Sequence, residues 1–210
     1  MSEYRVGVDI GGTFTDITVI NESTGQLSNL KVLTTNKEPA SGVIEALTSA
    51  NIELDKVSFL SHGTTIAINA LLERKGAKTA LITTDGFKDI LEMRRGARTH
   101  ILDPQMDKPH IFVPRRWRFG VKERVLWDGS ISTPLDEEEV TNVLSYLDSQ
   151  DIESIAICFL HSYANRSHEQ KVAEIITHKF PHIYHTMSAG LVPEIKEYER
   201  TSTAALNAYI

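Results

Sequence analysis

Two carboxylates, two glycines and two threonines stand together at residues 9–16. They follow an apolar run typical of a strand, and a second β-prone run begins at once, so Gly11 and Gly12 lie in a tight turn between paired strands. Glycine permits positive φ there and lets a bulky anion approach the backbone N–H groups closely. Asp9 is placed to hold a hydrated divalent cation, and Thr13 adds a hydroxyl donor. The spacing predicts a phosphate-binding hairpin; the alternative is an ordinary Gly-Gly hairpin with two incidental Asp residues.

This turn differs from the two commoner phosphate loops. The chain has no G-x-x-x-x-G-K-[ST] pattern, and the turn leads into a strand instead of a helix, which argues against a dinucleotide-binding fingerprint. A Gly-Gly-Thr hairpin after a first strand resembles the first phosphate motif of the actin, sugar-kinase and Hsp70 superfamily. The following Phe14-Thr15-Asp16 is similar to the hydantoinase A/5-oxoprolinase family.

Four blocks carry that resemblance in the order and spacing of the family's N-terminal domain: residues 8–16, 62–77, 81–89 and 193–203. The segment Arg94-Arg95-Gly96-Ala97-Arg98 departs most, because relatives often show an Arg-Gln-Asn-Arg type of sequence there. If this segment recognises the substrate, the identity of the substrate cannot be inherited by analogy.

The resemblance implies an enzyme that uses ATP and Mg²⁺. Members of the family open a lactam or hydantoin ring or carboxylate a ketone, which implies phosphoryl transfer to a carbonyl or enolate oxygen. Asp9, a candidate catalytic residue, would hold Mg²⁺ through water. Asp16 has two interpretations, since it would orient either the waters of Mg²⁺ or the hairpin itself. The implied nucleotide-binding residues are Gly11, Gly12, Thr13, Thr15 and Asp16.

Residues 62–65 end a predicted strand and open a helix, where unpaired N–H groups favour an anion. His62 would act as an acid, a base or an electrophile near neutral pH, and Thr64 is a candidate catalytic residue beside it. The structural alternative is that Thr64 caps the helix and His62 is a hydrogen-bonded core residue. Thr65 and Asn69, one helical turn apart on the same face, are candidate substrate contacts.

The composition is ordinary for a soluble globular protein, with 210 residues, 41% hydrophobic, 24% charged and a formal net charge of −6. No apolar run is long enough to cross a bilayer, and no signal peptide is recognisable. The single cysteine, Cys158, lies in the apolar run 154–160 and is expected to be a buried small hydrophobe, not a catalytic thiol. A chain without disulfides fits a cytoplasmic location.

Residues 88–124 hold ten Lys or Arg against five acids, a net of +5 on an acidic chain. This asymmetry predicts a local site for an anion, an acidic substrate or a partner surface; a solvated basic loop is the alternative. Arg94, Arg95 and Arg98 are candidate substrate contacts because a guanidinium meets a carboxylate or phosphate in bidentate fashion. Nucleic acid is not expected, since the pI is about 5.8 and no recognised nucleic-acid motif is present.

The coarse pattern predicts an α/β fold. Strand, helix and turn signals up to residue 92 follow the β-β-β-α-β-α-β order of a ribonuclease-H-like core, in which helices would cover both faces of a mixed sheet. The resemblance to the actin, sugar-kinase and Hsp70 superfamily implies that this core belongs to one lobe of an actin-like ATPase. We expect strands at 4–10, 14–20, 27–34, 57–61 and 77–83, with helices at 39–50 and 65–75, the second ended by Gly76. The hydrophobic face of the first helix is assigned to Val43, Ile44 and Leu47.

The remainder divides into a basic irregular loop at 93–120 and a second α/β portion at 121–210. The second portion is expected to hold a hairpin around Asp128-Gly129, a helix opened by Asp136, and then strand, helix, strand and helix. Glu197 and Arg200, three residues apart, are most simply a surface ion pair; a hinge or a substrate contact is the alternative. The chain stops inside its last helix without a stop signal, so we expect a fragment.

A cyclic amide hydrolase is the leading hypothesis for function. A ketone carboxylase subunit, a small-molecule kinase of the same superfamily and a non-catalytic interaction module are the alternatives. Actin-like architectures place ATP between two lobes, and this chain has one clear phosphate hairpin. The resemblance therefore implies a second, hydantoinase B-like subunit or a fused domain as partner, and an isolated chain with little activity.

Overall fold

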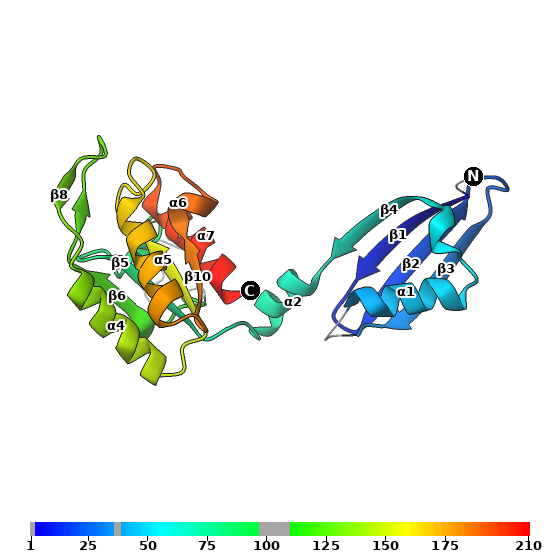
Figure 1. Ribbon diagram of the computed structural model, residues 1–210, viewed down its shortest axis with the longest axis horizontal. Coiled ribbons are helices and arrows are strands. Elements are labelled where there is room, and N and C mark those ends of the chain that lie inside the picture. The colour runs from blue at the N-terminus through cyan, green and yellow to red at the C-terminus, as the bar shows by residue number, and fades with distance from the viewer. Residues whose placement is uncertain (1–2, 36–38, 97–109) are drawn as a thin grey trace, which may run out of the picture. The chain divides into compact units, whose positions relative to one another are not determined.

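The computed structural model describes residues 3–35, 39–96 and 110–210 (Figure 1). The chain divides into two compact units, Met1–Lys75 and Gly76–Ile210. The sequence places this boundary at residue 92, which lies inside the second unit.

The first unit is a four-stranded mixed sheet in the order β3-β2-β1-β4. Strand β1 is antiparallel to β2 and parallel to β4, and β2 is antiparallel to β3. Strands β1 to β3 follow the predicted positions within one residue. The elements are β1 (Tyr4–Ile10), β2 (Phe14–Asn21), β3 (Leu27–Leu33), α1 (Pro39–Ser49), the 3₁₀ helix η1 (Leu54–Lys56), β4 (Val57–Thr64) and α2 (Ile66–Glu73).

The core of this unit forms because apolar residues alternate along its strands. Val6, Val8 and Ile10 of β1 are buried, and they face the same side as the apolar residues of β2 and the helix α1. Helix α1 buries Ala46 and Leu47 there, whereas Ile44 is 50% exposed, so its assignment to the buried face is wrong. Helix α1 packs along one face of the sheet (Figure 1), and the other face carries the exposed carboxylates described below.

Strand β4 differs from its prediction as a short buried strand. It is longer and lies at the edge of the sheet, paired with β1 alone. Phe59 and Leu60 on opposite sides of it are 50% and 58% exposed. An apolar run of this length does not by itself distinguish a central strand from an edge strand.

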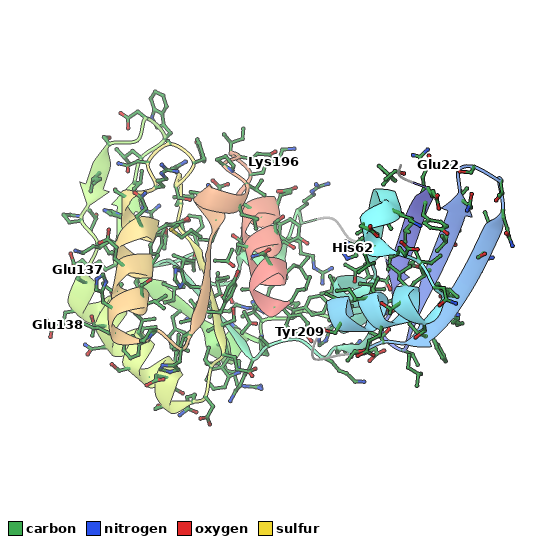
Figure 2. All side chains as sticks on the ribbon, turned by 45° about the vertical axis from the view of Figure 1, so that its right-hand side comes forward. Glu22, His62, Glu137, Glu138, Lys196 and Tyr209 are labelled. Carbon is green, nitrogen blue, oxygen red and sulfur yellow. The ribbon has the colours of Figure 1, made fainter. Side chains whose placement is uncertain are left out.

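The second unit is built on a parallel sheet in the order β10-β9-β5-β6, with a small antiparallel ribbon of β7 and β8. Strands β5 and β9 are buried along their whole length, as expected where helices cover both faces. Helices α4 and α5 pack against each other, and α7 packs across β9, β10 and β5 (Figures 1 and 2). The elements are β5 (Thr79–Thr84), α3 (Ile90–Met93), η2 (Arg115–Trp117), β6 (Arg118–Val121), β7 (Arg124–Val125), β8 (Ile131–Thr133), α4 (Glu137–Ser149), β9 (Ser154–Cys158), α5 (Ser167–Lys179), β10 (Tyr184–Met187), α6 (Ser188–Leu191) and α7 (Glu197–Tyr209).

The α/β class, with a mixed sheet and a second α/β portion, is confirmed. One strand lies elsewhere than predicted: β5, the last strand of the expected ribonuclease-H-like order, is a central strand of the second sheet. Its six buried residues give it the double-sided burial of a central parallel strand. The order of elements along a chain does not reveal which sheet a strand joins.

Gly76 is not the cap that ends α2. The helix ends at Arg74, whose left-handed backbone (φ 57°) directs its N–H to the carbonyls of Ala70 and Leu71. Gly76 is instead required by packing in the second unit, because a Cβ added there would collide with the ring and the carbonyl of Tyr209.

Replacing Gly76 by alanine is therefore expected to destabilise the second unit by about 1–3 kcal/mol, the usual cost of overpacking. The melting temperature should fall by several degrees in thermal denaturation followed by circular dichroism. Gly190→Ala is the matched control, since the nearest atom to an added Cβ there is 4.0 Å away. Equal melting temperatures for the two variants would contradict the packing argument.

Candidate functional site

The turn between β1 and β2 is closed by a hydrogen bond from the N–H of Gly11 to the carbonyl of Phe14, 2.9 Å long. A Cβ on Gly11 would lie 2.9 Å from that same carbonyl oxygen, and a Cβ on Gly12 would lie 3.2 Å from Nδ2 of Asn69. The backbone of this turn can therefore be approached closely only while both positions are glycine.

Thr34, directly after β3, braces the turn. Its hydroxyl donates to the carbonyl of Gly11 at 2.8 Å, and its N–H donates to the carbonyl of Thr13 at 3.0 Å. The same hydroxyl lies 3.0 Å from that of Thr15, which is buried. Thr15 is thus engaged inside the unit, and its predicted contact with nucleotide has no support from this geometry. Thr34 was not identified from the sequence, because its place beside the turn depends on the pairing of β3 with β2.

Asp9 and Asp16 are direct cross-strand neighbours in the β1–β2 register. Both are exposed on the face opposite the core. Lys31 on β3 holds the Asp16 carboxylate at 3.0 Å, whereas the carboxylate of Asp9 has no hydrogen bond or ion pair among the described residues. Because Lys31 neutralises Asp16, the exposed carboxylate of Asp9 remains accessible to a hydrated cation.

The start of α2 lies against the same turn because β4 runs parallel to β1. Thr64 faces Ile10 in the register; its hydroxyl donates to the Ile10 carbonyl at 3.1 Å and accepts from the N–H of Ile66 at 3.3 Å. The N–H of Thr65 donates to the same carbonyl at 3.1 Å, and Nδ2 of Asn69 donates to the Thr65 hydroxyl at 3.4 Å. Thr64, Thr65 and Asn69 are thus gathered beside the turn, together with the first amides of a helix.

His62 lies near the end of β4 (Figure 2), on the other face of the sheet from Asp9, because it pairs in register with Val8, whereas Gly63 pairs with Asp9. It is exposed, so its interpretation as a hydrogen-bonded core residue is wrong. Its role as an acid, a base or an electrophile stays a prediction, and the fold of this unit separates it from the carboxylates.

The basic segment belongs to the second unit. Nε of Arg95 pairs with Oε1 of Glu199 on α7 at 2.5 Å, and the pKa of Glu199 is lowered by its own backbone N–H and by Arg95. Arg94 lines a cavity of the same unit. Arg98 lies outside the described residues.

Arg200 does not form the expected surface ion pair with Glu197. It is 1% exposed on the inner side of α7, where Nη2 donates to the carbonyl of Phe159 at 2.7 Å. Next to it, Thr201 Oγ1 lies 3.1 Å from Sγ of Cys158, and burial raises the pKa of that thiol. Cys158 is buried, as predicted, and a raised pKa disfavours the thiolate that a nucleophile requires.

A pair of carboxylates at the hairpin, Asp9 and Asp16, fits magnesium better than a metal that needs a cage of protein ligands. Among the residues that the structure describes, no group of three or more His, Cys, Asp or Glu side chains is placed to hold a metal ion. Mg²⁺ in phosphate-binding sites commonly keeps several waters and takes only one or two carboxylates, the remaining ligands coming from phosphate. In the same described part of the chain, no helix has the length and apolar character needed to span a membrane.

Comparison with known proteins places this geometry in a family. Residues 5–180 match the family model described as the hydantoinase/oxoprolinase N-terminal region. An uncharacterized protein of Methanocaldococcus jannaschii is 44% identical over 99% of this chain and 31% of its own length. The caprolactamase subunit alpha of Pseudomonas jessenii is 34% identical, with coverage of 99% and 31%.

Solved structures agree. The crystal structure of the ATP-dependent caprolactamase from Pseudomonas jessenii superposes with a TM-score of 0.82 at 33% identity, over 99% of this chain and 31% of that one. The nucleotide-free structure of acetone carboxylase, an enzyme of ATP-dependent acetone carboxylation, superposes with a TM-score of 0.84 at 27% identity. The match covers 100% of this chain and 32% of that one. The chain thus spans about a third of the length of these relatives.

Proposed function

The chain belongs to the hydantoinase/oxoprolinase family, whose N-terminal region it matches, and from this premise we propose that it is the nucleotide-binding N-terminal part of an ATP-dependent cyclic amide hydrolase. ATP would supply the phosphoryl group that activates the carbonyl oxygen of the amide. Relatives named as an ATP-dependent caprolactamase and as an enzyme of ATP-dependent acetone carboxylation support the use of ATP.

The observation that carries the proposal is the glycine turn, which Thr34 holds by hydrogen bonds and beside which the start of α2 lies. Gly11 and Gly12 place no side chain on the turn, and Thr34 holds the carbonyls of Gly11 and Thr13 by hydrogen bonds. The amides of the turn and the hydroxyl of Thr13 would hold phosphate oxygens. Asp9 would hold Mg²⁺ through water, with Asp16 orienting those waters or the hairpin.

A second subunit or a fused domain would complete the enzyme. The caprolactamase relative is named as a subunit, and this chain covers 31% of it. We propose a hydantoinase B-like partner, a small cyclic amide as substrate, and little activity for these 210 residues alone. The cytoplasm is the proposed compartment, supported by a single buried cysteine.

A ketone carboxylase is the second candidate, favoured by the TM-score of 0.84 to acetone carboxylase. One experiment separates the candidates: ADP release by the complete protein and its partner is measured with a panel of cyclic amides and with ketones plus bicarbonate. Release that depends on a cyclic amide supports the hydrolase, and release that depends on ketone and bicarbonate supports the carboxylase. A stable phosphorylated product would indicate a kinase, and assembly without any ATP use would indicate an interaction module.

The proposed role of His62 in substrate activation can be tested by mutation, although His62 lies on the other face of the sheet from Asp9. If it takes part in substrate activation, His62→Gln should lower turnover by roughly 10²-fold or more, the scale of general acid–base catalysis, and keep nucleotide affinity. Steady-state kinetics and nucleotide titration measure the two effects. Because His62 is exposed, the variant should melt like the wild type. Unchanged turnover would remove His62 from the site.

A further inference from the structure

The second unit has a topological switch point between its two central strands. From β5 the chain moves to the edge strand β6, and from β9 it moves in the opposite direction, to the other edge strand β10. Because crossovers between parallel strands are right-handed, connections that move in opposite directions lie on opposite faces of the sheet. The carboxyl ends of β5 and β9 are therefore the place where a parallel α/β sheet of this order commonly binds a ligand.

A crevice lies at this switch point. Its walls are the ends of the two strands, the segment after β5 and the first turns of α7, and they include Thr83, Phe87, Cys158, Glu197 and Arg200. The crevice has a volume of about 10 Å³, close to that of a single water-sized body, so it can receive one oxygen atom of a ligand. Phe87 is half-buried and offers apolar surface to the remainder of that ligand.

Arg200 carries a hydrogen-bond donor that the protein does not use. The side chain is 1% exposed, and its Nε has no hydrogen-bond partner. Its other nitrogens donate to backbone carbonyls, that of Phe159 at 2.7 Å and that of Glu194 at 3.4 Å, and it forms no ion pair with any acidic side chain that the structure describes. A buried donor without an acceptor is rare in proteins and costs free energy. The unused N–H of Arg200 therefore indicates an acceptor oxygen that a ligand supplies.

Glu197 supplies the opposite kind of group to the same crevice. It is half-buried one turn before Arg200 on α7, and its carboxylate has no hydrogen bond or ion pair within the described part of the chain. A donor and an acceptor thus line one crevice without pairing with each other. They are complementary to a group that presents an acceptor and a donor side by side, as the C=O and N–H of a cyclic amide do, because the ring holds both on one side.

We propose that this crevice binds the amide group of a cyclic amide. The carbonyl oxygen accepts from Nε of Arg200, the amide N–H donates to the carboxylate of Glu197, and the ring lies against Phe87. The choice of a cyclic amide rests on the proposed hydrolase function, whereas the site itself rests on residues of the second unit alone. Hydrogen bonds to charged partners are the stronger ones, so both contacts favour the amide over a hydrocarbon ring of the same size.

Binding of δ-valerolactam to the complete protein, measured without ATP by ligand-observed NMR titration, tests the site. N-methyl-δ-valerolactam is the matched ligand, because it keeps the carbonyl and lacks the N–H. We expect saturable binding of the lactam and binding of its N-methyl derivative that is about 10-fold to 100-fold weaker, the usual effect of losing a hydrogen bond to a charged group. Equal affinity for the two ligands, or no saturable binding of the lactam, would overturn the proposal.

Glu197→Gln and Arg200→Lys remove one contact each, since Gln lacks the carboxylate and Lys lacks Nε. Each variant should bind the lactam about 10-fold to 100-fold more weakly. In Glu197→Gln the preference for the lactam over its N-methyl derivative should also shrink, which a merely structural role of Glu197 would not cause. Glu199→Gln is the control, because Glu199 lies on the same helix and pairs with Arg95 instead; its affinity should match the wild type.

Wild-type affinity and an unchanged preference in Glu197→Gln would overturn the site. Circular dichroism melting reports folding, and because Arg200 is buried, Glu197→Gln decides the outcome if Arg200→Lys does not fold. ADP release keeps the two proposals apart. Release that depends on a cyclic amide, with unchanged lactam affinity in Glu197→Gln, would retain the hydrolase function and reject this site. The predicted binding pattern without amide-dependent ADP release would retain the site and reject the function.

Discussion

Gly12→Val in the complete protein is expected to abolish ATP-dependent turnover. A Cβ at this position would lie 3.2 Å from Nδ2 of Asn69, and the further carbons of valine would occupy the space over the turn amides where phosphate oxygens are proposed to bind. A branched side chain also opposes the turn itself. ADP release by the assembled enzyme, measured at saturating substrate, gives the result.

Gly7→Ala, in the strand β1 that leads into the turn, is the control, because its Cβ would be 4.0 Å from the nearest atom, the carbonyl oxygen of Thr18. That variant should turn over like the wild type. Wild-type ATP hydrolysis in Gly12→Val would remove the phosphate assignment from the hairpin.

Asp9→Asn is expected to lose Mg²⁺-dependent activity by roughly 10²-fold or more while the protein stays folded. The Asp9 carboxylate lies on the exposed face, and no described neighbour depends on it for a hydrogen bond, so the fold should tolerate the amide. The amide lacks the charge that holds a hydrated cation. Turnover as a function of Mg²⁺ concentration, together with circular dichroism, separates the two effects.

Asp16→Asn is the informative comparison, since Asp16 stands directly opposite Asp9 and is held by Lys31. An equal loss in both variants would assign Asp16 to the waters of Mg²⁺. Retained activity in Asp16→Asn would indicate that Asp16 orients the hairpin and does not contact the waters of Mg²⁺. An unchanged Mg²⁺ dependence in Asp9→Asn would refute the metal assignment.

Local signals predicted the parts of this protein that local interactions determine. The Gly-Gly turn between two β-prone runs fixed the ends of β1 and the start of β2. The acids at the start of α4 likewise predicted its beginning, where the Asp136 side chain accepts from the N–H of Glu139 at 2.9 Å. The pattern at residues 57–75 likewise predicted that Thr64 and Thr65 lie where a strand ends and a helix begins, whereas their place beside the turn depends on the pairing of β4 with β1.

Long-range pairing accounts for what the sequence did not predict. Strand β5 joins the second sheet through its pairing with β6 and β9, which no local pattern encodes. Thr34 reaches the turn only because β3 pairs with β2 in the observed register. The charge of Arg200 predicts an exposed side chain. The residue is buried instead, because its helix packs across β9 and its guanidinium donates to the Phe159 carbonyl. The environment of a polar side chain in such cases is set by tertiary packing.

The coupling of ATP use to ring opening tests the central claim most directly. The complete protein, assembled with its partner, is supplied with Mg²⁺-ATP and with the cyclic amide that stimulates ADP release most strongly, and ADP and opened ring are quantified together. The account predicts that they form in equal amounts and that no ring opens without ATP. Ring opening in the absence of ATP, or ring opening that continues in Gly12→Val, would contradict it.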